Sequence, residues 1–134
     1  MAKPKRMTYF KANLEDKPGA LLGILKGLKT KNIGLKGLWG FATSSGRAEV
    51  YVVPNDAEKL RTLWKSSGTI VEEGAIFHLG GPDKTGVLLK PLEALAAAGV
   101  NLNAAHAIGG SGTFGSFLWV KPEDVEKAAK ALGG

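Results

Sequence analysis

The chain has no cysteine and only two histidines, so several kinds of chemistry are missing from the start. Without cysteine there are no disulfides, thiol nucleophiles or thiolate zinc sites, and a reducing, cytoplasmic location is expected. Two histidines do not make a histidine-rich metal cage, and we expect no metal and no cofactor. No apolar run approaches the roughly 18 residues that a membrane span needs. The basic start leads into Thr8–Ala12 rather than an apolar segment, which argues against a secretory signal.

Glycine is in excess: there are 19 among 134 residues, close to twice the average usage. The formal net charge is +6, which keeps nucleic acid among the partners to consider. The charge is uneven, because residues 1–67 hold 13 basic and 5 acidic side chains whereas residues 68–134 hold 5 and 7. This opposite net charge of the two halves is explained by association of the halves at least as well as by binding to nucleic acid.

The sequence contains a repeat of half its length. A shift of 67 residues aligns Asp16–Leu22 with Asp83–Leu89, and eight of the twenty positions from 16 to 35 are then identical. After the next turn the shift becomes 68, which pairs Pro54 with Pro122 and Asp56 with Asp124. A one-residue slip in a turn is what two copies of one fold tolerate.

Each copy has the pattern strand, helix, strand, strand, helix. Helices are predicted after Asp16 and Asp83, on leucine stripes that end near Asn32 and Gly99. A late start or a kink is expected around Pro91. The predicted strands are 9–14, 33–41, 48–53 and 69–72 in the first copy, and 75–79, 100–108 and 114–120 in the second. The second helices open at Pro54–Asp56 and Pro122–Asp124.

This order predicts an α+β fold of two tandem ferredoxin-like βαββαβ sandwiches, each an antiparallel sheet with helices on one face. The second copy lacks its last strand, which leaves an edge open to a neighbour or another chain. We predict a first domain at 1–73, with a basic extension at 1–6, and a second domain at 74–134.

The turn from the first strand to the first helix is the most informative motif. Asp16-Lys17-Pro18-Gly19-x-Leu21 is repeated, without the proline, from Asp83 to Leu88. The aspartate is suited to cap the helix, and glycine keeps the backbone clear at the helix start. Free amides at the positive end of a helix form a site for an anion such as a carboxylate. The alternative is that both turns are only helix starts.

This motif, followed by Gly99-Val100-Asn101-Leu102, resembles the ACT domain family of amino-acid-binding regulatory modules. The resemblance covers nearly the whole chain as two copies, although Gly34 stands where the first copy should have asparagine and Thr85 replaces proline in the second. It implies sites where the strand-to-helix loop of one copy faces a neighbouring copy. The implied ligand-binding residues are Asn13, Asp16, Gly19, Ala20, Asp83, Thr85, Gly86, Val87 and Asn101.

The main functional hypothesis is a non-catalytic regulatory or sensor protein that binds a small amino acid or related carboxylate. The expected partners are a second copy of the chain, as a homodimer, and a regulated enzyme. Two alternatives stay open: a structural interaction module, and an RNA-binding protein resembling the RNA-recognition motif, with aromatic segments at 9–14 and 112–117. Gly110–Gly115 matches a dinucleotide pattern, but a strand follows it instead of a helix, so a hairpin is expected.

Overall fold

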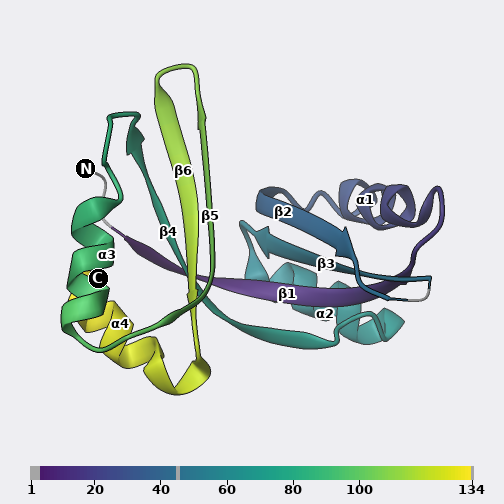
Figure 1. Cartoon of the computed structure of the whole chain (residues 1–134). Coiled ribbons are helices and arrows are strands. Elements are labelled where there is room, and N and C mark those ends of the chain that lie inside the picture. Colours follow the sequence, from purple (N-terminus) through teal and green to yellow (C-terminus); the bar gives the residue numbers. More distant parts are fainter. Residues whose placement is uncertain (1–3, 45, 134) are drawn as a thin grey trace. The chain divides into compact units, whose positions relative to one another are not determined.

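The computed structural model describes residues 4–44 and 46–133. Over these residues the chain forms two compact units, one of residues 8–74 and one of residues 75–133 together with 4–7 (Figure 1). We call them the N-terminal unit and the C-terminal unit and describe each by itself. None of the helices in the described ranges is long and apolar enough to cross a membrane.

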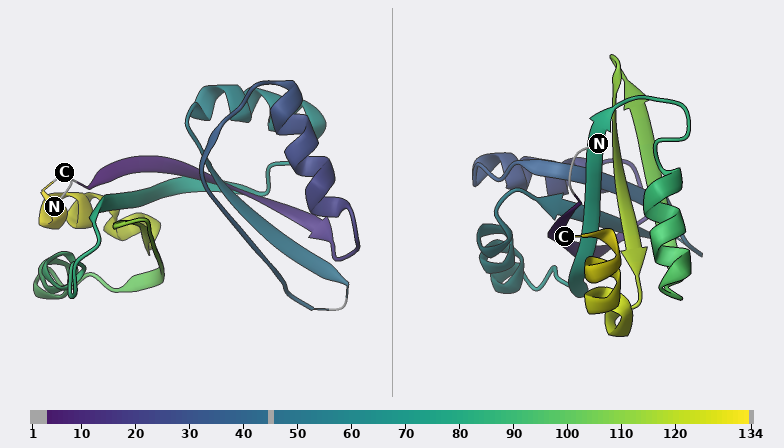
Figure 2. Two further views of the ribbon diagram at one scale, coloured as in Figure 1. Left: turned by 90° about the horizontal axis from the view of Figure 1, so that it is seen from above. Right: turned by 90° about the vertical axis from the view of Figure 1, so that its left-hand side faces the viewer.

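The N-terminal unit has strands in the hydrogen-bonded order β2-β3-β1-β4, with two helices on one face (Figure 2). Both pairs β1–β3 and β2–β3 are antiparallel. The elements are β1 (Lys5–Glu15), α1 (Ala20–Thr30), β2 (Leu35–Ala42), β3 (Arg47–Pro54), α2 (Ala57–Ser67) and the start of β4 (Glu72–Pro82).

The core of the N-terminal unit lies between this sheet and its helices. Alternate residues of a strand point to opposite faces, so Phe10 and Ala12 of β1 and Val50 and Val52 of β3 share the buried face. The helices add side chains to the same cluster, and the Phe10 ring meets the Trp64 ring edge-on at 6.4 Å between centroids. The helical members of the buried cluster are Leu28, Leu60 and Trp64.

The C-terminal unit repeats this plan, with β4 next to β6 and β6 next to β5, both pairs antiparallel. Figure 2 shows its two longer helices on one face of these strands. Its buried cluster includes Phe77, Leu79, Leu95 and Leu118. The other elements are α3 (Leu89–Ala97), β5 (Leu102–Gly110), β6 (Thr113–Val120), the short 3-10 helix η1 (Pro122–Asp124) and α4 (Val125–Leu132). The α+β class predicted from sequence is therefore confirmed.

Two strands contribute to both units. The start of β1, up to Met7, belongs to the C-terminal unit, and β1 is the strand next to β4. It fills the edge left by the absence of a strand after α4, and Arg6 pairs there with Glu126 of α4 at 2.8 Å. The predicted strand at 69–72 was wrong in extent, because β4 begins only at Glu72 and runs without a break to Pro82.

The first helices end as the sequence predicts. Asn32 and Gly99 have positive φ angles of 55° and 74° directly after α1 and α3. Helix α3 starts at Leu89, which places Pro91 in its first turn, where the missing N–H costs no helical hydrogen bond. The expected late start is confirmed.

The leucine stripe of α1 is not simply a core face. Leu28 is buried, but Leu21, Leu22 and Leu25 are exposed. Helix α3 is similar, since Leu95 is buried whereas the leucines of its first turn, Leu89 and Leu92, are exposed. The 3.6-residue spacing of the leucines predicted where the helices lie. It did not predict that most leucines of each stripe are exposed.

Candidate functional site

Each unit brings its strand-to-helix loop beside the turn of a hairpin. In the N-terminal unit the amide of Asp16 donates to the carbonyl of Gly46 at 2.8 Å, and in the C-terminal unit Asp83 donates to Gly112 at 2.9 Å. Both acceptor glycines have φ of 77°, which favours glycine. The two candidate loops are therefore built alike, and hairpin residues border each of them.

The backbone shape that the two loops share depends on glycine rather than on a capping aspartate. Gly19 has φ of 87° and directly precedes α1, and Gly86 has φ of 76°. Neither α1 nor α3 receives a side-chain cap hydrogen bond, so the expected capping by Asp16 and Asp83 was wrong. The two carboxylates are left for other contacts.

Some of the backbone amides expected to hold an anion already have acceptors. Ala20 donates to Lys17 at 3.3 Å, and Val87 donates to Lys84 at 3.1 Å. Within the described ranges, the amides that find no acceptor in the first loop are those of Gly19, Leu21 and Leu22. In the second loop the amides of Lys84, Thr85, Gly86 and Leu88 likewise find no acceptor among the described residues. The anion site is therefore narrower than the sequence predicts.

The C-terminal unit holds its aspartate over a glycine of the edge strand. A Cβ placed on Gly109 would lie 2.8 Å from Oδ2 of Asp83, so the carboxylate occupies the space that a side chain would need. In the repeat Gly109 corresponds to Ala42, so the first copy has a methyl group at the position where Gly109 has none. This contact distinguishes the second loop from the first.

The two asparagines of the predicted set, Asn13 and Asn101, lie in different positions relative to the candidate loops. Asn13 pairs with Glu49 in register and lies on the face of the sheet opposite Ala12 and the core. Asn101 precedes Leu102, which pairs with Val120, whereas Asp83 adjoins the other end of β6. At about 3.3 Å per residue these ends of β6 are roughly 23 Å apart. Asn101 and Asp83 of one unit therefore cannot contact the same small ligand.

Solved structures with the same arrangement exist, although no protein-family model and no curated protein matches the sequence. A protein of Bacteroides thetaiotaomicron superposes with a TM-score of 0.81 at 20% identity, covering 98% of this chain and 90% of that one. The regulatory subunit of aspartate kinase from Thermus thermophilus, in its ligand-free form, gives 0.61 at 16% identity, over 97% and 93%. A structure of aspartokinase alpha and beta subunits gives 0.56 at 17%, over 98% and 95%.

The fold shared with these structures agrees with the tandem ACT-like arrangement that the motifs of this sequence resemble. The similarity spans nearly the full length of both chains in each of the three comparisons, so it includes both repeats of this chain, which we call the first and second ACT-like copies. At these identities it establishes the architecture, and the ligand has to be argued from the residues of this chain.

One polar side chain of the second ACT-like copy was missed by the sequence analysis. Ser116 is 1% exposed, and its hydroxyl has no hydrogen-bond partner among the described residues. It lies on the same face of β6 as Phe114, whose register partner is Gly109 under Asp83. A buried hydroxyl without a partner costs about 1–3 kcal/mol. The sequence feature that could have indicated this residue is that Ser116 is the polar residue on an otherwise apolar face of β6.

Two aromatic residues of the segments behind the RNA-binding alternative lie in the cores of the two copies. Phe10 is 0% exposed in the core of the first ACT-like copy, and Phe114 is buried in the second. Rings packed inside a sheet–helix core are unavailable to nucleic-acid bases. The dinucleotide pattern is the β5–β6 hairpin, as expected, with Ser111 and Gly112 forming the turn.

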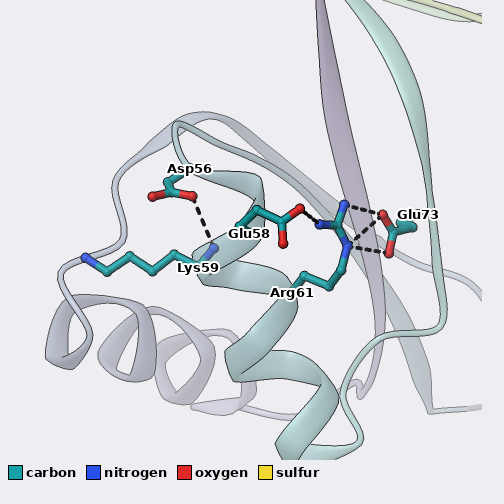
Figure 3. Close-up of polar contacts among 5 residues, drawn as sticks. All are labelled: Asp56, Glu58, Lys59, Arg61 and Glu73. Atoms are coloured by element: carbon teal, nitrogen blue, oxygen red, sulfur yellow. Dashed lines mark hydrogen bonds and ion pairs between the residues drawn. The ribbon is translucent and has the colours of Figure 1, made fainter.

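An ionic cluster fixes helix α2 of the first ACT-like copy against the start of β4. Arg61 donates to both carboxylate oxygens of Glu73, at 2.7 to 3.1 Å, and to Glu58 (Figure 3). The guanidinium also lies over the Phe10 ring, 5.5 Å from its centroid. Hydrogen bonds from Arg61 are the main reason that the pKa of Glu73 lies below its ordinary value of 4.5.

This lowered pKa predicts a pH dependence of stability. A carboxyl with a lower pKa in the folded state stabilises the fold above its unfolded pKa and loses this effect as pH falls. We expect Glu73→Gln to lower the free energy of unfolding at pH 7, with the difference from the parent protein disappearing as pH falls below 4.5. Urea denaturation across this range measures it. Glu58→Gln, which removes the more exposed carboxylate, should have the smaller effect; an equal or pH-independent loss contradicts the assignment.

Proposed function

We propose that this protein is a non-catalytic regulatory or sensor protein that binds a small amino acid or a related carboxylate. The contact that supports this most directly is the Asp83 carboxylate lying over Gly109, beside a loop whose Thr85 and Gly86 amides have no acceptor in the described chain. Two of the similar structures are regulatory subunits of aspartate kinase, from Thermus thermophilus and Thermus flavus, which favours a regulatory role with an enzyme as partner.

The chemistry of the second loop suits both charged groups of an amino acid. A carboxylate accepts hydrogen bonds from an ammonium group, and Asp83 has no ion-pair partner in the described residues. Backbone amides that point out of a tight turn bind a carboxylate. The role assigned to Asp83 is to hold the ammonium, and that of Thr85 and Gly86 is to hold the carboxylate.

Thermal-shift measurements with the twenty amino acids at millimolar concentration test this proposal. Ligand that binds the folded state alone raises the melting temperature. We expect a shift with at least one amino acid and its loss in Gly109→Ala, because the new methyl group displaces the Asp83 carboxylate. Gly110→Ala is the matched control, since a Cβ there meets nothing within 4 Å. If no amino acid produces a shift, the chain is better described as a structural interaction module. If both variants respond like a parent protein that does shift, the ligand binds away from Asp83 and this site assignment is wrong.

A second copy of the chain is proposed as a partner. Asn101 lies too far from Asp83 of its own unit, so the two contact one ligand only if they come from different copies. Strand β5 ends the order of hydrogen-bonded strands, has no charged residue or proline, and exposes 76% of Ile108. Such an edge invites pairing with another strand.

The edge strand gives a direct test of self-association. We expect sedimentation equilibrium to show a dimer, and Ile108→Lys to shift it toward monomer because a charged edge residue opposes strand pairing. Val71→Lys places the same charge at another exposed apolar position, outside the strands, and should leave the dimer intact. A parent protein that is monomeric at all concentrations contradicts this part of the proposal.

A further inference from the structure

One stretch of the first copy is basic and contains no carboxylate. Residues 17–48 hold six basic side chains and no acidic one, whereas the equivalent residues 84–115 of the second copy hold two basic side chains and one acidic one. In the first copy this stretch forms α1, β2 and the beginning of β3. Because the second copy builds the same elements without this charge, the charge is not needed for the fold and belongs to the surface.

The exposed face of α1 is apolar as well as basic. Leu22 and Leu25 are 55% and 39% exposed. Lys26 follows Leu22 by four residues and Lys29 follows Leu25 by four, so each leucine has a lysine beside it on the helix surface. Across the described ranges, neither lysine lies within ion-pair distance of a carboxylate. Grouped exposed apolar side chains with a polar rim are typical of interaction surfaces.

A hollow of about 410 Å³ adjoins this face, between the end of α1 and the start of β2. Two of its lining residues, Leu28 and Ile33, belong to the buried cluster of the unit, whereas Leu25 and Lys29 are exposed. The hollow therefore connects the apolar core with a basic rim, and among the described residues no carboxylate lines it. Strand β2 beside it ends the order of hydrogen-bonded strands (Figure 1).

The second copy keeps the two leucines of this surface, at positions that are exposed there as well. It does not keep the lysines, since Lys26 corresponds to Glu93 and Lys29 to Ala96. The nearly neutral surface beside β5 is suited to the self-association proposed above. Two lysine surfaces of different chains repel each other, because like charges brought together across an interface are unfavourable. The surface of α1 therefore favours a partner of the opposite charge.

We propose that the exposed face of α1 and the adjoining hollow form a docking surface for a partner protein that supplies an apolar anchor side chain and a rim of acidic residues. The anchor fills the hollow, and the acidic rim pairs with Lys26 and Lys29. This inference rests on the proposed regulatory role, in which the partner is the regulated enzyme. An anionic membrane would use the leucines and lysines without the hollow, and nucleic acid would leave the leucines unused.

Two synthetic helical peptides test the proposal, with the backbone amide shifts of Leu25, Lys29 and Leu35 followed by NMR. One peptide has a leucine face and glutamates elsewhere, and the other has a lysine in place of each glutamate. We expect the acidic peptide alone to shift these amides at millimolar concentration. Leu25→Gln should weaken its binding by about fivefold or more. Leu92→Gln is the matched control, since it changes the equivalent residue of the second copy, which is 37% exposed against 39%.

The contribution of charge is measured separately with two double variants. Lys26→Gln combined with Lys29→Gln should weaken binding of the acidic peptide by about tenfold at low salt, and by less at high salt, where exposed charges are screened. Lys127→Gln combined with Lys130→Gln removes the same charge at the same spacing from α4, whose two lysines are also exposed. This control should change the affinity by less than about twofold.

The proposal is overturned if neither peptide binds, if both bind equally, or if each variant and its control weaken binding to the same extent. Binding to vesicles of phosphatidylcholine and phosphatidylglycerol without binding of the acidic peptide assigns the surface to a membrane instead. Loss of the dimer in Leu25→Gln assigns it to a second copy of the chain, which also contradicts the proposal. A protein that shows a thermal shift with an amino acid but binds no peptide keeps its proposed ligand site, so the two failures are distinguishable.

Discussion

Replacing Phe77 with alanine is expected to lower the free energy of unfolding of the C-terminal unit by about 3–5 kcal/mol. Phe77 is 2% exposed and lies in β4 among the buried side chains of that unit. The variant loses the transfer free energy of the ring and leaves a cavity that close-packed neighbours fill only in part. Phe10, which is 0% exposed at the equivalent position of the first copy, should show a loss of similar size.

Urea denaturation followed by hydrogen exchange of amides in each unit measures these losses. Phe41→Ala is the matched control, since this ring is 51% exposed and stacks on the Tyr51 ring with 6.0 Å between the centroids. Such a pair contributes about 0.5–1.5 kcal/mol. If Phe41→Ala were as costly as Phe77→Ala, burial in the two sheet–helix cores would not be the main source of stability.

Removing residues 1–7 is expected to destabilise the C-terminal unit by about 2 kcal/mol or more, although these residues precede the whole first copy. The start of β1 is the neighbour of β4 in that unit, and Met7 is half-buried there. The deletion turns β4 into an open edge, which also favours aggregation. Hydrogen exchange of the β4 amides from 75 to 82 should accelerate most.

Arg6→Gln separates strand pairing from the ion pair in this experiment. The Arg6–Glu126 pair is solvent-exposed, and pairs of this kind contribute at most about 1 kcal/mol. The single substitution should therefore have a much smaller effect than the deletion. A deletion no more harmful than Arg6→Gln would mean that the start of β1 does not stabilise the C-terminal unit.

Local patterns predicted the elements well, because their causes are local. The period-2 alternation around Phe10 and Val52 and the backbone freedom of Gly99 depend on a few neighbouring residues. The continuity of β4 across the repeat boundary does not depend on such local features, and the sequence predicted two separate strands there, at 69–72 and 75–79. A neighbouring strand supplies the hydrogen bonds that keep glycine extended, and the pairing of β1 with β4 joins segments about 65 residues apart in sequence.

The candidate site also combines local features that the sequence predicted with contacts between distant residues that it did not predict. The repeated Asp-Lys-x-Gly motif located both loops and their positive-φ glycines. The role of Gly109 could not be predicted, since the carboxylate of Asp83 reaches it across 26 residues of chain. Asn101 was grouped with Asp83 on the family resemblance, and only the β5–β6 register shows how far apart they lie. Spacing along the chain does not report distances across a sheet.

The shared strands affect how the protein folds during synthesis. The first residues of β1 leave the ribosome before any other part of the sheet, but Glu126, which pairs with Arg6, is made some 120 residues later. The C-terminal unit therefore cannot close until nearly the whole chain has emerged, whereas residues 8–74 have their own core much earlier. The basic start of β1 stays unpaired until β4 (Glu72–Pro82) has been made, and its lysine and arginine oppose premature pairing with other strands.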